Sequence, residues 1–163
     1  MKRLFYILLL FSSLLTLLGC GKNASPRALC WQVYPITGQI TVTKGDGAIK
    51  ADLLLKKEQM TLTLQGQNEG TVFILNKDEA VLKAGDLTLQ IGKSRLPEEG
   101  LLFEALTLPE DAPLLKSTAT LDGRACTVFT HVTDEVNFRY YVENQHLLRL
   151  VIEKEDPITV DFS

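Results

Sequence analysis

Short runs in which apolar and polar residues alternate fill most of this chain, and they constrain its fold more than any other feature. In the range 49–55 nearly every second residue is apolar, and most of those between are charged. Such a period of two places apolar side chains on one face of an extended strand and polar ones on the other. The pattern recurs at 40–43, 60–65, 87–91, 136–142 and 148–152. It predicts a sheet with one apolar face.

Turn signals separate these runs and set the number of strands. Lys44-Gly45-Asp46-Gly47 and Asp122-Gly123 are hairpin signals, because glycine accepts positive φ without a steric penalty. Counting the runs between such turns gives roughly six strands before residue 92 and about five after residue 116. The expected fold is therefore mainly β, a single antiparallel meander of about ten strands.

The pattern changes between Gly92 and Lys116. Three prolines interrupt this segment, and Glu98-Glu99 precedes a cluster of leucine and phenylalanine. Acidic residues are favourable in the first turn of a helix, so a short helix is expected here, with an irregular covering segment as the alternative. In either form the segment supplies apolar side chains that cover the sheet.

The first nineteen residues have the character of an export signal. Lys2 and Arg3 precede the run Leu4 to Leu18, which is almost wholly apolar but shorter than the roughly 20 residues needed to span a bilayer as a helix. The run ends in Leu17-Leu18-Gly19-Cys20. The open alternatives from the residues alone are an ordinary secretory signal and an uncleaved anchor.

These four residues resemble the lipobox of bacterial lipoproteins. The resemblance implies cleavage before Cys20 and attachment of a diacylglycerol, with fatty acyl chains such as palmitate, to its thiol. Gly21, in place of the aspartate that retains such proteins in the inner membrane of Gram-negative bacteria, implies anchoring in the outer membrane facing the periplasm. The expected organisation is a signal peptide over 1–19, a lipidated tether over 20–29 and a β domain over 30–163.

The cysteine content bears on whether the chain has a disulfide, and the net charge bears on which classes of molecule it can bind. If Cys20 is acylated, Cys30 and Cys126 are the two remaining cysteines, and an oxidising compartment favours a disulfide between them. Two separate buried thiols are the alternative. The net charge is −3, and becomes about −5 once Lys2 and Arg3 are removed, which argues against nucleic acid as a partner.

No pattern typical of an enzyme is found. The sequence lacks a Gly-x-Ser-x-Gly elbow and a phosphate-binding glycine loop, and it has two histidines, too few for a typical histidine-based zinc site. His131 beside Asp134 is the one candidate base with an orienting carboxylate, and no nucleophile is placed near it by the sequence. We therefore expect no enzymatic activity, no metal and no cofactor.

The closing strands resemble those of the lipoprotein-carrier superfamily, the half-barrels of the Lol transport pathway. The similar segments are Phe138-Arg139-Tyr140-Tyr141-Val142, Leu147 to Ile152, and Ile158-Thr159-Val160-Asp161-Phe162. This resemblance implies a curved half-barrel whose concave face is apolar and holds acyl chains, closed by residues 97–115.

Two functions follow from these observations. The first is a lipoprotein that binds a hydrophobic ligand, a lipid or an acylated protein, in the concave sheet. Ligand pockets of this kind are mostly apolar, and the candidate lining residues are Met60, Leu62, Leu64, Leu89 and Phe138. The second is a structural lipoprotein that docks an envelope protein complex through an exposed strand edge.

Overall fold

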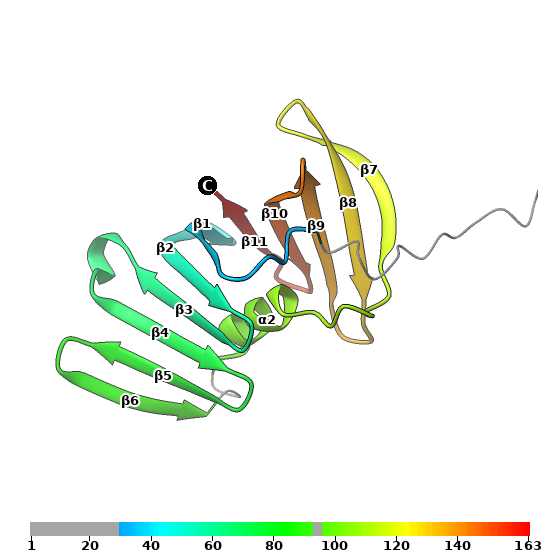
Figure 1. The fold of residues 1–163 in the computed structure, drawn as a ribbon. Coiled ribbons are helices and arrows are strands. Elements are labelled where there is room, and N and C mark those ends of the chain that lie inside the picture. Colours follow the sequence, from blue (N-terminus) through cyan, green and yellow to red (C-terminus); the bar gives the residue numbers. More distant parts are fainter. Residues whose placement is uncertain (1–29, 93–95) are drawn as a thin grey trace, which may run out of the picture.

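The fold is a single antiparallel sheet of eleven strands with one short α-helix in its hollow (Figure 1). It was obtained as a computed structural model that describes residues 30–92 and 96–163. The strands are β1 (Ile36–Lys44), β2 (Gly47–Lys56), β3 (Gln59–Leu64), β4 (Thr71–Asn76), β5 (Glu79–Ala84), β6 (Leu87–Gly92), β7 (Leu115–Leu121), β8 (Arg124–Val132), β9 (Asn137–Glu143), β10 (His146–Glu153) and β11 (Ile158–Phe162). The mainly β fold, the curved open sheet and the single short helix expected from the sequence are confirmed.

The strand order shows how the two runs of strands join. It reads β6-β5-β4-β3-β2-β1-β11-β10-β9-β8-β7, so each run is a meander and the first and last strands pair at the centre. Thr41 lies opposite Asp161 and Val42 opposite Val160. The chain therefore leaves one edge of the sheet at β6 and re-enters at the other edge with β7.

The register places the side chains of the main hydrophobic core on one face of the sheet, which we call the inner face. Ile40 of β1 pairs with Ala51 of β2, and Leu150 of β10 pairs with both Tyr140 of β9 and Val160 of β11. All five are buried and belong to one hydrophobic cluster. Because direct partners across antiparallel strands share a face, this alternation builds a continuous core on the concave side.

Helix α2 (Pro97–Leu106) lies in the hollow of the inner face, where Figure 1 shows it between the two halves of the sheet. Proline begins the helix and Glu98 and Glu99 occupy its first turn, as the sequence predicted. Leu102, Ala105 and Leu106 are buried against the sheet. The segment 97–106 is thus the covering element that the apolar face requires.

A second covering element is the chain before β1. Trp31 is buried, and its ring stacks on that of Tyr140 with 5.2 Å between centroids. Tyr34 of the same segment is half-buried and packs against the core. Residues 30–35 therefore fill part of the hollow beside α2.

Candidate functional site

A row of apolar side chains crosses the inner face from the centre of the sheet to its β6 edge. The residues pair directly, strand by strand, and we call them the inner row: Leu53, Leu62, Phe73, Leu82 and Leu89. The side chains become more exposed along the row. Leu53 and Leu62 are 3% and 4% exposed, Phe73 and Leu82 are half-buried, and Leu89 is 43% exposed. The core therefore continues into an uncovered apolar surface on the same face.

The partial covering has a simple cause in the position of α2. The helix packs on β4 and β10, above the neighbouring row of inner-face residues, where Leu55, Met60 and Leu75 are fully buried. One helix of ten residues is only about 15 Å long, because each residue adds 1.5 Å. It is too short to cover the inner face of eleven strands.

A cavity of about 370 Å³ lies where the inner row begins. It is bordered by the chain before β1, the C-terminal end of α2 and the central strands, and no Lys, Arg, Asp or Glu lines it. The lining residues are Trp31, Ile36, Thr37, Gly38, Gln39, Leu53, Leu106, His146, Leu147, Leu148, Phe162 and Ser163. Leu53 belongs to both the cavity lining and the inner row, so the cavity lies at the central end of that row.

A second hollow lies between α2 and the β2–β3 and β4–β5 turns. It measures about 710 Å³, but Lys57, Glu58, Lys77 and Asp78 line it together with Glu104. Charged groups lose hydration when an apolar ligand covers them, so this hollow is unfavourable for such a ligand. Of the two, the cavity beside Trp31 is the one whose lining suits an apolar molecule.

The C-terminal end of α2 is held by side chains from outside the helix. The last four carbonyls of a helix have no partners within it. Here the Tyr140 hydroxyl donates to the Ala105 carbonyl at 2.8 Å, and Gln32 Nε2 and the Tyr34 hydroxyl donate to the Leu106 carbonyl at 3.1 and 3.3 Å. The segment before β1 and strand β9 therefore fix the position of the covering helix.

Burial keeps the Tyr140 hydroxyl in its donating form. Desolvation raises the pKa of Tyr140 far above its ordinary value, and the negative charge of Glu104 raises it further. Tyr34 shows the same direction, with burial as the larger cause and Glu110 as the smaller. Both phenols remain protonated at neutral pH, as their hydrogen bonds to helix carbonyls require.

The N-terminal end of α2 is joined to the sheet by an exposed ion pair. Glu98 Oε1 contacts Lys44 Nζ at the end of β1, and Lys154 Nζ lies 3.9 Å from the same oxygen. The hydrogen bond from Lys44 to Glu98 raises the pKa of Lys44. Exposed pairs of this kind contribute little to stability, so the C-terminal hydrogen bonds and the apolar face hold the helix more firmly.

The five residues predicted to line a ligand site all lie on the inner face, but in different surroundings. Met60, Leu62 and Phe138 are 0%, 4% and 0% exposed and belong to the core. Leu64 is half-buried and Leu89 is exposed. The structure therefore brings the five residues to one surface and leaves two of them open to solvent.

Sequence reasoning missed the residues that connect these two environments. Phe73 and Leu82 continue the row from Leu62 to Leu89, and Trp31 borders the cavity at its other end. The sequence of β4 is apolar on both faces, because Val72, Phe73, Ile74 and Leu75 follow one another. Its pattern therefore did not distinguish Phe73, which faces inward, from Ile74, which faces outward.

The predicted disulfide between Cys30 and Cys126 is not formed, and both thiols are free. Cys30 packs against the main core, whereas Cys126 is buried outside that cluster. The reason is strand alternation. Phe129 of β8 pairs with Tyr140 on the inner face, and Trp31, the residue after Cys30, stacks on Tyr140. Cys126 is three residues before Phe129 in β8, so its side chain lies on the outer face. The sheet itself separates the two cysteines.

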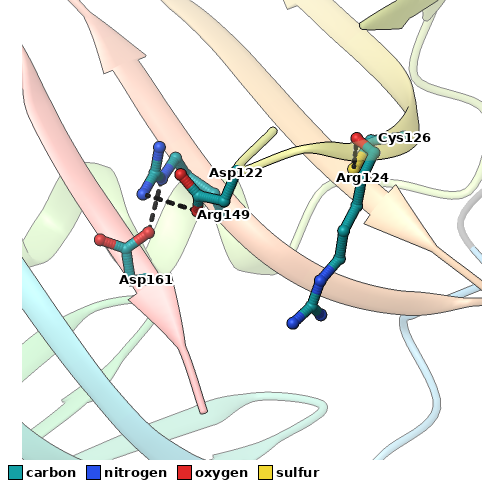
Figure 2. A network of polar contacts seen from close by, with 5 residues as sticks. All are labelled: Asp122, Arg124, Cys126, Arg149 and Asp161. Carbon is teal, nitrogen blue, oxygen red and sulfur yellow. Dashed lines mark hydrogen bonds and ion pairs between the residues drawn. The ribbon is translucent and has the colours of Figure 1, made fainter. Parts of the chain in front are cut away.

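Cys126 is buried on the outer face, and its thiol lies 3.7 Å from the Arg124 carbonyl. In a separate group of contacts, the guanidinium of Arg149 lies between Asp161 and Asp122 (Figure 2). Arg149 Nε and Asp161 Oδ1 are 2.5 Å apart, and the hydrogen bond to Asp161 raises the pKa of the arginine. These contacts bring the β7–β8 turn back over β10 and β11.

The contacts of His131 are with the chain's own backbone and core. Its Nδ1 lies 3.0 Å from the Pro113 carbonyl, and its ring stacks on that of Phe138, with 6.2 Å between the ring centroids.

Over residues 30–92 and 96–163 no group of three His, Cys, Asp or Glu side chains is close enough together to hold a metal ion. Within the same residues, no helix has the length and apolarity that crossing a bilayer requires. Cys20 and the signal segment lie outside the described residues.

No protein-family model matches the chain, and no curated protein matches it. Among solved structures, it is similar to the lipoprotein LppX of Mycobacterium tuberculosis, with 16% identity over 83% of this chain and 93% of that one and a TM-score of 0.43. It is also similar to a LolA superfamily protein of Nitrosomonas europaea, with 8% identity over 86% and 92% and a TM-score of 0.44.

Proposed function

We propose that this chain is an envelope lipoprotein that holds an acyl chain on the inner face of its sheet. In this proposal residues 1–19 are a signal peptide, residues 20–29 a tether, and acyl chains on Cys20 attach the β domain to the periplasmic side of the outer membrane. The single observation that supports a bound ligand is the inner row, in which the exposed fraction of the side chains rises from 3% at Leu53 to 43% at Leu89.

The energetic argument is that a soluble β domain gains nothing by leaving such a row uncovered. Each methylene that moves from water into an apolar site contributes about 0.8 kcal/mol, so an acyl chain lying along Phe73, Leu82 and Leu89 would gain several kcal/mol. Leu87, on the same face of β6, is 54% exposed and widens this surface. An acyl chain at this place would pack against the partly exposed end of the inner row and would not have to displace buried core side chains.

Site-specific photo-crosslinking in cells tests the ligand. A photoreactive phenylalanine analogue is placed at Leu89, on the inner face, or at Gln90, the next residue of β6, on the outer face. Strand alternation makes Gln90 the matched control. We expect a lipid adduct by mass spectrometry at position 89 and none at position 90. Equal lipid labelling at both positions would indicate nonspecific contact with the membrane and contradict the proposal.

The alternative function, docking of an envelope protein, is favoured by one observation. β6 is an edge strand, and among the described residues no strand pairs with its free hydrogen-bonding edge. The strand contains no proline and no charged side chain. Proteins usually protect such edges with those residues. In the same experiment, a stoichiometric protein crosslink at both positions without lipid would favour this second function.

The acyl anchor is tested separately. Cells are grown with an alkyne analogue of palmitate, and the protein is isolated and examined for the label. We expect label on the wild-type protein and none on Cys20→Ala, while Cys30→Ala and Cys126→Ala keep it. Label that persists in Cys20→Ala would place the acyl chain elsewhere and refute the predicted lipobox.

A further inference from the structure

We infer that the cavity beside Trp31 recognises a neutral carbonyl group, the ester or amide that links an acyl chain to its carrier. This inference rests on the proposed function and identifies which end of the ligand binds where. Trp31 is 6% exposed, and its indole Nε1–H has no hydrogen-bond partner among the described residues. The same side chain lines the cavity.

An unpaired indole N–H is unusual in a buried position. Buried donors are almost always paired, and leaving one unpaired costs about as much as the lost hydration of the group. Two neighbouring polar groups of this segment bond elsewhere, since Gln32 Nε2 and the Tyr34 hydroxyl both donate to the Leu106 carbonyl. Among the described residues no acceptor is placed to receive the hydrogen of Nε1. A ligand carbonyl oxygen is an acceptor of the required kind.

The charge of the lining decides which carbonyl fits. No lysine or arginine lines the cavity, and the one imidazole of the lining, His146, is exposed to solvent, so an ionised carboxylate would lose hydration without a buried cation beside it, which is unfavourable. An ester or amide oxygen accepts the same hydrogen bond without that penalty. The rest of the ligand is expected to be apolar, because Leu53, Leu106, Leu147 and Phe162 form much of the wall.

The strand irregularity beside the cavity gives the carbonyl a way in. Nε1 is covered by surrounding atoms, so a wall residue must move for the acceptor to reach it. The register between β9 and β10 shifts between Leu147 and Arg149, and Leu147 and Leu148 both line the cavity and are half-buried. A bulge leaves one residue without a ladder partner. These two leucines are therefore the movable part of the wall.

The chain has one tryptophan, which allows the hydrogen bond to be removed by a single atom. The full chain carrying Cys20→Ala, freed of lipid by unfolding and refolding, is prepared with tryptophan or with benzothienylalanine, in which sulfur replaces the indole N–H. Methyl palmitate, palmitate and hexadecane then compete with a fluorescent fatty acyl probe. Circular dichroism and melting temperature establish that the two proteins fold alike.

With tryptophan we expect methyl palmitate to bind about tenfold more tightly than hexadecane, the factor that corresponds to 1.4 kcal/mol, and more tightly than palmitate. With benzothienylalanine the preference over hexadecane should fall to about twofold or less, since a lost hydrogen bond removes its specific contribution. In a ¹⁵N spectrum, the one indole N–H signal should shift downfield with methyl palmitate and remain nearly unchanged with hexadecane.

An ester preference that survives the replacement by sulfur would overturn the role of Trp31. Tighter binding of palmitate than of its methyl ester would overturn the choice of a neutral carbonyl. Either result leaves the proposed function standing if the hydrocarbon chains still bind. Failure of all three ligands to displace the probe would contradict both the cavity inference and the proposed acyl site.

Discussion

Tyr140→Ala is expected to lower the free energy of unfolding by about 3–5 kcal/mol, the range measured for removal of a large buried aromatic ring. The Tyr140 side chain is 0% exposed, stacks on Trp31 and donates to the Ala105 carbonyl of α2. Its loss leaves a cavity under both covering elements at once. Urea unfolding followed by circular dichroism measures the change. A loss below about 0.5 kcal/mol, within the range of ordinary surface substitutions, would show that the inner face repacks freely.

Tyr140→Phe separates the hydroxyl from the ring. At neutral pH we expect a loss of about 1 kcal/mol, the usual net value of one hydrogen bond. Above pH 10 the difference should shrink. Burial raises the folded-state pKa of Tyr140 above its unfolded value of 10.0, so the hydroxyl contributes fully below pH 10 and loses its contribution as the unfolded phenol ionises. A difference between the two proteins that is constant to pH 11 would contradict this account.

Leu89→Glu is expected to weaken binding of an acyl ligand by more than tenfold and to leave the melting temperature nearly unchanged. The side chain is 43% exposed at the end of the inner row, so a carboxylate there remains hydrated in the free protein. A ligand chain that covers it must remove that hydration, which is costly. Competition between methyl palmitate and a fluorescent acyl probe provides the measurement.

Gln90→Glu is the control for Leu89→Glu. It introduces the same charge one residue later in β6, on the outer face, where the proposal has no ligand. Its affinity should stay within about twofold of the wild type, which is less than 0.5 kcal/mol. Equal weakening by the two substitutions would mean that net charge, and not the inner row, controls binding.

Much of the fold could be predicted from the sequence because its signals are local. Alternation in segments such as 136–142 specifies a strand and its apolar face, and Glu98-Glu99 after Pro97 specifies the start of α2. The pairing of β1 with β11 could not be predicted in this way, because nothing near Val42 in the sequence identifies Val160 as its partner. Register between distant strands depends on the whole sheet.

The candidate site was predicted less well for the same reason. Alternation identified the face on which Met60 and Leu89 lie, but not that α2 covers the first and leaves the second exposed. The disulfide prediction was wrong because counting cysteines says nothing about which side of the sheet each thiol occupies. Cys30 and Cys126 are separated by the backbone layer that the alternation itself creates.

The central pairing of the terminal strands has a consequence for a chain that is synthesised from its N-terminus. Ser163 Oγ donates to the Gln39 carbonyl across a separation of 124 residues, so β1 lacks its second neighbour until β11 has arrived. Until then the protein has two unjoined halves, each with an open hydrogen-bonding edge. Chaperones that shield such edges would therefore matter most before β11 has paired with β1 and joined the two halves.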